Sequence, residues 1–455
     1  MGGAQALKGT ARAYGESLLA ALGVSPAQPL GVDEEHPALG WAASGLMALT
    51  GRSDGAPQMC PIPLTACADG ALAALASLGP PRAFGAMRGS RLLAERAAMA
   101  GLHRAGAKSA GGSCRLLATA DGSIALNLAR ADDWALLPAW LQRDVAADWS
   151  AVAEAVRAFR VDDLIERGRL LGLAVAANAL PGTAPAGWCV TMLDVRAEHH
   201  VATPQRPRVV DLSSLWAGPL CGHLLQQLGA EVIKVESVQR PDGARSGPAE
   251  FFDLLHAGQR SVAVDVRSKS GRAQLKALLD RADIVIEASR PRALRQLGIH
   301  AEALLREHPQ LTWLSITGHG RDAAHEQAIA YGDDAAVAAG LSYWQQAASG
   351  EPLFCGDAIA DPLTGLHAAL AAWATHCAGG GRLLSVSLCE VVRHCIAFDA
   401  PQCVEHARTR AEQWTQQVRE AGIEMALPLA RAVKGRAAAL GADTEAVFRQ
   451  LGIAC

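Results

Sequence analysis

One continuous stretch, residues 209–236, restricts the fold more than any other part of the chain. It reads VVDLSSLWAGPLCGHLLQQLGAEVIKVE: an apolar run, an Ala-Gly-Pro turn, leucines at helical spacing, a glycine and a second apolar run. Proline is favoured in the first turn of a helix, and glycine just after its end. The stretch therefore predicts a strand, a helix and a second strand, the βαβ unit that begins a parallel sheet. At its strand-to-helix turn, free backbone N–H groups suit an anionic ligand.

The chain after residue 236 continues this alternation. Apolar runs separated by helical patterns predict further strands at 261–266, 284–287, 312–316 and 383–388. Alternating β and α elements imply an α/β fold with a doubly wound parallel sheet. We therefore expect a Rossmann-like large domain over residues 208–400, followed by a C-terminal tail over residues 401–455.

The first 207 residues divide into three predicted units. Residues 1–110 have the pattern of a helical segment. Residues 111–180 have the pattern of a small α/β domain, in which Asp121-Gly122 forms the turn of a β-hairpin. Residues 181–207 contain prolines and no apolar period, so they are expected to be a linker.

An internal repeat relates residues 36–75 to residues 331–370 at one fixed offset. Identical residues in register are Ala43/Ala338, Gly45/Gly340, Leu46/Leu341, Pro57/Pro352, Cys60/Cys355, Gly70/Gly365 and Leu75/Leu370. Matching alanines are expected by chance in an alanine-rich chain. The matching Pro, Cys and Gly residues favour a duplicated segment instead. The N-terminal segment is thus predicted to be an incomplete copy of the C-terminal part of the large domain.

Composition and missing motifs exclude several functions. The net charge of -3 over 455 residues gives no support for a nucleic-acid or membrane-surface partner. Eleven cysteines without a CxxC pair, and no signal peptide, predict reduced thiols in a cytoplasmic protein. The first strand is not followed by GxGxxG, and no GxSxG elbow is present, which argues against nicotinamide and α/β-hydrolase chemistry. No histidine belongs to a set with zinc-ligand spacing, so no metal is expected.

Three segments in order resemble the N-terminal part of the family III CoA-transferases, also called the CaiB/BaiF family. They read DLSSLWAGPLCGHLLQQLGAEVIKVE, LLHAGQRSVAVDV and DIVIEASRPRALRQLGI, and the similarity extends over about residues 209–395. Residues 113–178 resemble the small domain of this family, which normally follows the large one, and residues 422–452 resemble its tail. The chain is therefore similar to parts of two copies in tandem. The resemblance implies CoA binding by the large domain and a homodimer.

The resemblance also implies a nucleophile. Transferases of the family use an Asp that attacks the acyl-CoA thioester, forms an anhydride and then carries CoA as an aspartyl thioester. The matching segment here is CGDAIADPLTGLHAAL, which assigns the role to Asp361, with Asp357 as a neighbouring acid. A carboxylate is a competent covalent nucleophile. An Asp before Pro362 is also suited to cap a helix, and the two roles are compatible. In the first copy the equivalent residue is Ala66, so that copy lacks the nucleophile.

A second set of residues is implied to bind CoA. Tyr331 matches an aromatic residue near the reacting end of CoA in formyl-CoA transferase, although packing at a loop–helix junction is an equally good explanation. Arg260 and Arg290 are implied to lie near the nucleotide, where arginine suits phosphate. The whole set is Trp216, Ala217, Ser237, Leu255, His256, Ala257, Gly258, Arg260, Ala288, Ser289, Arg290, Arg295 and Tyr331.

Several of these positions depart from the family pattern. Trp216 replaces a Gln, Ser237 replaces an Arg, and Gln296 replaces an Arg for which Arg295 is a possible substitute. Acids nearby are predicted to be structural: Asp333 and Asp334 as helix caps, and Glu390 in the first turn of a helix.

Three functions stay open. The first is a CoA-transferase acting on an acyl-CoA and a carboxylic acid acceptor. The second is a non-catalytic CoA-binding paralogue or subunit, favoured by the departures and by the incomplete first copy. The third is an acyl-CoA racemase or isomerase. Racemases of the family carry His at the position of Tyr331, and here only the first copy has it, as His36 opposite Ala66, which disfavours two-base proton exchange.

Overall fold

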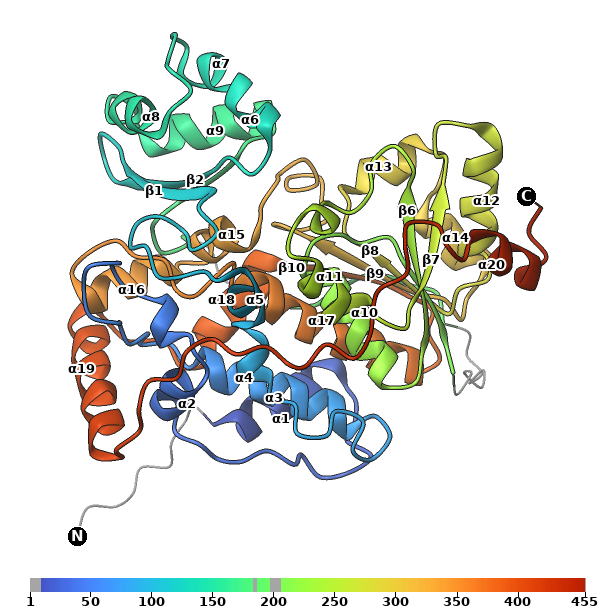
Figure 1. Ribbon diagram of the computed structural model, residues 1–455, viewed down its shortest axis with the longest axis horizontal. Coiled ribbons are helices and arrows are strands. Elements are labelled where there is room, and N and C mark those ends of the chain that lie inside the picture. Colours follow the sequence, from blue (N-terminus) through green and yellow to red (C-terminus); the bar gives the residue numbers. More distant parts are fainter. Residues whose placement is uncertain (1–9, 183–185, 197–205, 455) are drawn as a thin grey trace.

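A computed structural model describes residues 10–182, 186–196 and 206–454 (Figure 1). Its larger sheet has seven strands in the order β4-β10-β9-β8-β5-β6-β7. Neighbouring strands are parallel except for β4, which pairs antiparallel with β10. The strands are β4 (Val190–Asp194), β5 (Arg208–Asp211), β6 (Glu231–Ser237), β7 (Arg260–Val264), β8 (Ile284–Glu287), β9 (Thr312–Thr317) and β10 (Arg382–Ser387). The predicted α/β fold with a doubly wound sheet is confirmed.

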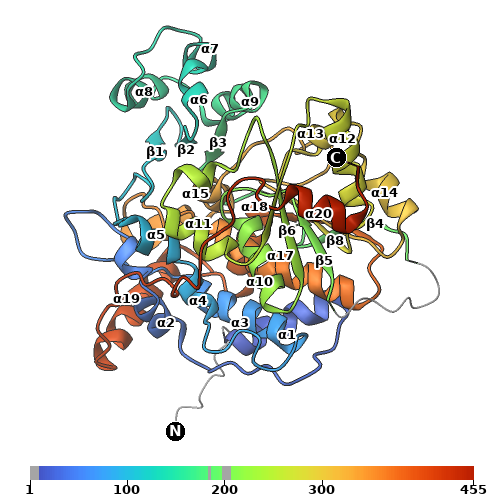
Figure 2. The same ribbon diagram turned by 45° about the vertical axis from the view of Figure 1, so that its right-hand side comes forward.

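Alternate residues of these strands enter two different cores, because side chains of a strand point to opposite faces of the sheet. Val209 packs with the helices on one face, and Val210 packs with those on the other. The first face is covered by α10 (Ala217–Gln227) and α17 (Ala360–Cys377), and the second by α12 (Lys269–Leu279), α14 (Ala301–Glu307) and α20 (Thr444–Leu451) (Figure 2). Burial on both faces explains why the strands are continuous apolar runs.

The remaining elements of the large domain connect these layers. They are the 3-10 helix η2 (Gly243–Ser246), α11 (Ala249–His256), α13 (Pro291–Gln296), α15 (Gly332–Ala338), α16 (Leu341–Ser349) and α18 (Leu388–Phe398). The predicted βαβ unit is formed by β5, α10 and β6, and Gly229 follows the helix in the left-handed conformation with φ of 101°. The four later strands also form, within a few residues of their predicted positions.

The segment predicted to be a linker contains a strand that its sequence did not suggest. Strand β4 lies within residues 181–207, and residues 183–185 and 197–205 of that segment are outside the described part of the chain. Val190 and Met192 are largely exposed, because β4 is an edge strand without a buried face. A strand without a buried face has no apolar alternation for a sequence pattern to detect.

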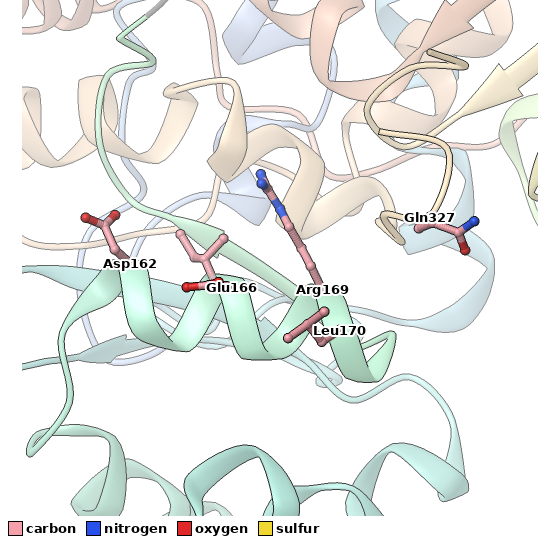
Figure 3. Close-up of a pocket in the computed structure, with 6 residues that line it drawn as sticks. Asp162, Glu166, Arg169, Leu170 and Gln327 are labelled. Carbon is pink, nitrogen blue, oxygen red and sulfur yellow. The ribbon is translucent and has the colours of Figure 1, made fainter. Parts of the chain in front are cut away.

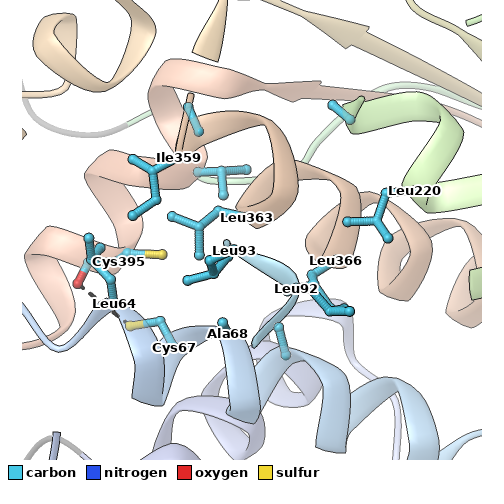
Figure 4. Packing of buried hydrophobic residues seen from close by; sticks show 14 of the residues in the cluster. Leu64, Cys67, Ala68, Leu92, Leu93, Leu220, Ile359, Leu363, Leu366 and Cys395 are labelled. Carbon is cyan, nitrogen blue, oxygen red and sulfur yellow. Dashed lines mark hydrogen bonds between the residues drawn. The ribbon is translucent and has the colours of Figure 1, made fainter. Parts of the chain in front are cut away.

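The N-terminal segment shares its core with the large domain. It comprises α1 (Ala11–Leu22), α2 (Pro37–Ala43), η1 (Met47–Leu49), α3 (Leu64–Ser77), α4 (Gly89–Leu92) and α5 (Glu95–Ala100). Helix α3 packs against α17, and residues such as Leu64, Leu92 and Leu363 belong to one apolar cluster (Figure 4). The first 110 residues therefore do not form a separate folding core.

The structure bears out the internal repeat. Helices α2 and α15 begin and end at equivalent positions, since Pro37 and Gly332 are separated by the same 295 residues as Cys60 and Cys355. Gly45 and Gly340, which follow these helices, both adopt the left-handed conformation, with φ of 89° and 90°. Glycine reaches this conformation without steric cost, which explains why both copies have it there.

The small domain packs against the large domain. Its antiparallel sheet of β1 (Cys114–Ala118), β2 (Ser123–Asn127) and β3 (Ala174–Ala177) includes the predicted hairpin. Helices α6 (Ala131–Ala135), α7 (Leu137–Leu141), α8 (Trp149–Val156) and α9 (Val161–Leu171) cover one face of this sheet. Leu116, Ala125 and Ala176 on its other face pack against Val337 of α15. Figure 1 shows this domain above α15.

The tail crosses the molecule. After α19 (Val404–Glu420) the chain runs in an extended path past the N-terminal segment and ends at α20, beside the sheet (Figure 1). Among the residues that the structure describes, no helix has the length and apolar character needed to span a bilayer.

Candidate active site

The predicted nucleophile lies where two helices meet. Asp361 is in the first turn of α17 and is partly exposed. It is not the N-cap, as the capping interpretation required, because Ile359 holds that position. Gly332, the first residue of α15, faces it so closely that an added Cβ would overlap the Asp361 carboxylate and the carbonyl oxygen of Ala358. The start of α15 is therefore shaped around the Asp361 side chain.

Two further carboxylates and one guanidinium surround Asp361. Asp357 is fully buried and receives two hydrogen bonds from Arg96 of α5, at 2.9 Å from Nε and 2.5 Å from an Nη. Asp333 of α15 accepts a hydrogen bond of 2.9 Å from the backbone N–H of Ala358. The group thus combines three acids with one cation, and the cation comes from the N-terminal segment.

Burial changes how these acids titrate. It raises the pKa of Asp361 to about 7, and Asp333 and Asp357 raise it further, whereas Arg96 opposes the shift. Burial also raises the pKa of Asp333 to about 6. The pKa of Asp357 is raised by burial against the effect of Arg96. Asp361 can therefore lose and regain a proton near neutral pH, which suits a nucleophile that acts as a carboxylate.

Two strained backbone positions flank this group. Ala358 and Leu215 adopt positive φ values of 41° and 70°, which residues with a side chain rarely do. The carbonyl of Ala358 accepts a hydrogen bond of 2.9 Å from the backbone N–H of Asp361, and Leu215 directly precedes Trp216. Such strain is held only where surrounding structure enforces it, and it is concentrated at functional sites.

Trp216 lies against the same cation. It is the N-cap of α10, only 2% exposed, and the Arg96 guanidinium is 5.6 Å from its ring centroid. The Phe251 ring meets it edge to face, with centroids 5.5 Å apart. Within the described part of the chain its indole N–H has no hydrogen-bond partner. Trp216 therefore forms a wall of the site, and its side chain is covered by Arg96 and Phe251.

A buried ion network holds the turn that carries Trp216. The ammonium group of Lys234 lies 3.0 Å from Asp242 and 3.7 Å from Asp211. Asp242 also accepts a hydrogen bond of 2.9 Å from the backbone N–H of Leu215. The opening stretch of the βαβ unit is thus fixed by charges from β5, β6 and the loop after β6.

Tyr331 directly precedes Gly332 at the start of α15. It is the N-cap of α15 and is partly buried, and its backbone N–H donates to Asp334 at 3.1 Å. Asp334 therefore caps the helix as predicted, and it also accepts a hydrogen bond of 2.8 Å from Asn127 of β2. Burial raises the pKa of Asp334 to about 7.

Arginines gather beside Tyr331. Burial lowers the pKa of Arg290, and the charges of Arg292, Arg130 and Arg240 lower it further, while Tyr331 acts in the opposite direction. Arg240 follows β6, Arg290 and Arg292 follow β8, and Arg130 comes from the small domain. In the described residues, the side chains of Arg240, Arg290 and Arg292 form no ion pair. Unneutralised arginines at the carboxyl ends of parallel strands suit a phosphate-bearing ligand.

Other predicted cation positions lie apart from this group. Arg260, at the start of β7, pairs with Glu231 at 3.2 Å and with Gln450 of α20 at 2.5 Å. Arg295 pairs with Glu326 at 3.1 Å and with Glu302 at 3.5 Å. Both guanidinium groups are therefore already engaged by the protein.

The remaining residues predicted to bind CoA differ in burial and in hydrogen bonding. Leu255, His256 and Ala217 are buried, and Gly258 ends its turn with φ of 81°. Ala257 is partly buried and Ala288 is exposed. The hydroxyl of Ser289 donates to Glu287 at 3.4 Å, and that of Ser237 donates to Gln239 at 2.8 Å.

An open hollow of 470 Å³ lies between the small domain and the loop after β9. It is lined by Asp162, Ile165, Glu166, Arg169, Leu170 and Gln327, and Figure 3 shows Gln327 across the hollow from the residues of α9. A second hollow of 1070 Å³ follows the tail and includes Asp253 and Arg431. Neither of these two hollows includes Asp361.

Sequence reasoning missed five site residues, Arg96, Asn127, Arg130, Arg240 and Arg292. Arg240 lies three residues after Ser237. A basic residue so close to the end of β6 could have been included among the predicted site residues. Arg96 lies 261 positions from its partner Asp357 and belongs to no local motif, so no pattern could have paired them.

The chain is similar to known CoA-transferases over its second half. The model of the family described as CoA-transferase family III matches residues 206–451. A succinate–glutarate CoA-transferase of Agrobacterium fabrum is 30% identical over 201 residues, which cover 40% of this chain and 50% of the relative. A succinyl-CoA–D-citramalate CoA-transferase of Chloroflexus aurantiacus is 29% identical over 265 residues, which cover 54% of this chain and 64% of the relative. The chain thus spans between half and two thirds of the length of these curated relatives.

One solved structure is also similar. The hypothetical protein Rv3272 of Mycobacterium tuberculosis matches with a TM-score of 0.40 and 30% identity, over 43% of this chain and 58% of that one.

Proposed function

Because the chain belongs to CoA-transferase family III, we propose that it moves CoA from an acyl-CoA to a carboxylic acid through a thioester on Asp361. The observation that carries the proposal is the setting of Asp361: partly exposed, in the first turn of α17, with a pKa raised by burial to about 7. The group is basic enough to attack and acidic enough to be ionised at neutral pH.

The proposed reaction balances without an added proton. A carboxylate oxygen of Asp361 attacks the thioester carbon, the C–S bond breaks, and CoA leaves as a thiolate. The thiolate attacks the Asp361 carbonyl carbon of the resulting anhydride and releases the first acid as its carboxylate. The acceptor carboxylate then attacks the aspartyl thioester, and CoA returns to the acceptor acyl carbon while Asp361 is freed.

The surroundings of Tyr331 support a binding mode for the substrate. Arg240, Arg290 and Arg292 are proposed to contact the phosphates of CoA, with the thioester directed towards Tyr331 and Asp361. The relatives are named for succinate, glutarate and D-citramalate, so dicarboxylic acids are the first acceptors to test.

The experiment measures a covalent CoA adduct by intact mass after incubation with succinyl-CoA, and locates it by peptide mapping. We expect one adduct at Asp361 in the native chain and none in Asp361→Asn. Asp322→Asn, at an exposed acid paired with His325, is the matched control and should keep the adduct. An Asp361→Asn variant that still transfers CoA would show the mechanism to be wrong.

A non-catalytic CoA-binding subunit is the alternative that one observation favours. Trp216 is 2% exposed at a position implied to contact CoA. Calorimetric binding of CoA, without adduct or exchange across a panel of acids, would support this alternative. Uptake of deuterium at the α-carbon of an acyl-CoA would instead support a racemase. The homodimer and the cytoplasmic location stay predictions, and sedimentation equilibrium would distinguish the 47.4 kDa chain from its dimer.

A further inference from the structure

The two copies in this chain contact each other through equivalent surfaces. Cys60 and Cys355 are equivalent residues, and their Sγ atoms are 4.0 Å apart. The backbone N–H of Gly356 donates to Thr50 at 3.0 Å. In the opposite direction, the side chain of Gln345, which is the equivalent of Thr50, donates to the carbonyl oxygen of Met59 at 3.4 Å. Cys60 and Cys355 thus contact each other directly, as residues related by a two-fold axis do, and the equivalent residues Thr50 and Gln345 each bond a backbone group close to the cysteine of the other copy.

The segment that follows each copy covers the other copy. The small domain follows α5 of the first copy and packs on α15 of the second. Helix α19 follows α18 of the second copy and packs on α16 of that copy and on α2 of the first, with the Trp414 ring 5.6 Å from His36. Figure 1 shows the small domain above α15, and α19 beside α16 and α2.

The two copies differ at the position of the proposed nucleophile. On the side of the second copy, Arg96 from the N-terminal segment reaches Asp357 and lies over Trp216. On the other side, the residue equivalent to Asp361 is Ala66. The N-terminal segment thus lacks the acid and supplies a cation to the copy that has it.

We propose that Arg96, supplied by the incomplete N-terminal copy, is a positioning residue that holds Asp357 and allows Asp361 to act as a carboxylate. The inference rests on the proposed role of Asp361. Three carboxylates in one partly buried group repel one another when ionised. Arg96 binds both oxygens of Asp357 and supplies the positive charge that offsets this repulsion.

The charges that face Asp361 come from three elements. Arg96 of α5 lowers its pKa, whereas Asp333 of α15 and Asp357 of the preceding loop raise it. The backbone N–H of Gly332 also favours the ionised form. Without Arg96 both neighbouring acids remain, so Asp361 must ionise at higher pH. Without Asp357 one of these acids is gone, so Asp361 must ionise at lower pH.

The test is the rate of adduct formation on Asp361 with succinyl-CoA, measured between about pH 5.5 and about pH 9.5. The native rate should rise with a midpoint near 7. In Arg96→Gln we expect the midpoint to rise by about one unit, which is roughly a tenfold loss below the native midpoint and recovery at high pH. Arg96→Lys should restore part of the shift. Asp357→Asn should move the midpoint in the opposite direction.

Arg88→Gln is the matched control, because Arg88 belongs to the same copy and pairs with Glu35 at 3.3 Å on the inactive side. It should keep the native profile. A folded Arg96→Gln that keeps the native midpoint, or that loses the same factor at every pH, would overturn the inference.

If Arg96→Gln does not fold, Asp357→Asn decides, and a midpoint that does not fall overturns the proposal. A native chain that forms no adduct at all would instead refute the proposed function itself.

Discussion

At the scale of single residues, Asp361 combines two demands that oppose each other. A nucleophile needs a negative charge, yet burial and two neighbouring carboxylates disfavour that charge and raise the pKa of Asp361 to about 7. The environment therefore costs folding free energy whenever the group is ionised. Functional groups are often kept at the expense of stability in this way.

This conflict predicts a pH-dependent gain in stability on replacing Asp361. In the unfolded chain the carboxyl ionises near its ordinary value of 3.8, and in the folded chain near 7. Between these values the folded state binds more protons, so the free energy of unfolding falls as pH rises through this window. At about pH 8.5, above both values, the free energy of unfolding of Asp361→Asn should exceed that of the native chain by up to about 4 kcal/mol.

Urea unfolding measured at several pH values checks this expectation. The difference between the two chains should shrink steadily as the pH falls from 7 towards 4, and it should level off below about pH 3, where Asp361 is protonated in both the folded and the unfolded state. Equal stability of the two chains at alkaline pH would show that Asp361 ionises as freely when folded as when unfolded.

The sequence was enough to predict Asp361 and Tyr331 as site residues, but not the residues that surround them in the structure. Asp361 lies in a continuous segment with a recognisable order, and Tyr331 lies at the start of a helix that a local pattern predicts. Arg96 acts only through a contact made after folding, across 261 positions of sequence. Capping by Asp361 was wrong for a similar reason, since α17 begins at Ala360 and only the structure fixes that boundary.

At the scale of elements, the site depends on how closely α15 approaches α17. Gly332 begins α15, and any side chain there would meet the Asp361 carboxylate and the carbonyl of Ala358. Gly332→Ala should therefore displace the carboxylate and destabilise the fold by about 1–3 kcal/mol. A displacement of about 1 Å is enough to slow adduct formation about 100-fold.

The control for this variant is Gly31→Ala, because a Cβ there would have no atom within 4 Å. Gly31→Ala should form the adduct at the native rate, and its free energy of unfolding in urea should equal that of the native chain. If Gly332→Ala forms the adduct at the native rate, the close approach of the two helices has no part in the chemistry.

Element prediction succeeded where burial imposes a pattern. Strands β5 to β10 are buried on both faces and appear in the sequence as apolar runs. Strand β4 was missed because its side chains are largely exposed. An edge strand of this kind forms through hydrogen bonds to the neighbouring strand, and the local sequence pattern contains no information on that neighbour.

At the scale of the whole molecule, the tail ties the N-terminal copy to the large domain. Arg431 contacts Glu95 of α5 at 2.6 Å and 2.9 Å, and donates to His223 of α10 at 2.8 Å. Glu95 is buried, and burial followed by the charge of Arg431 lowers the pKa of His223 to about 3. His223 is therefore neutral and able to accept this hydrogen bond at all ordinary pH values.

Loss of the contacts of Arg431 should destabilise the attachment of the tail to both the N-terminal copy and the large domain. Arg431→Gln leaves the buried Glu95 without its cation, which costs about 3 kcal/mol of unfolding free energy. Urea unfolding measures this loss, and limited proteolysis should cut the tail faster. Arg436→Gln, on the exposed part of the same tail, should change stability by less than about 0.5 kcal/mol. Equal effects of the two variants would show that the tail is held by other contacts.

The meeting of two related halves within one polypeptide has a consequence for how such a protein changes over time. When identical chains assemble, each mutation is expressed on both sides of the axis, so neither side can specialise alone. Here each half is encoded separately. One half can therefore have Ala66 where the other has Asp361, and Arg96 can be present in one half alone. Two related halves in one polypeptide are thus free of the symmetry that binds identical subunits, and each can change without the other.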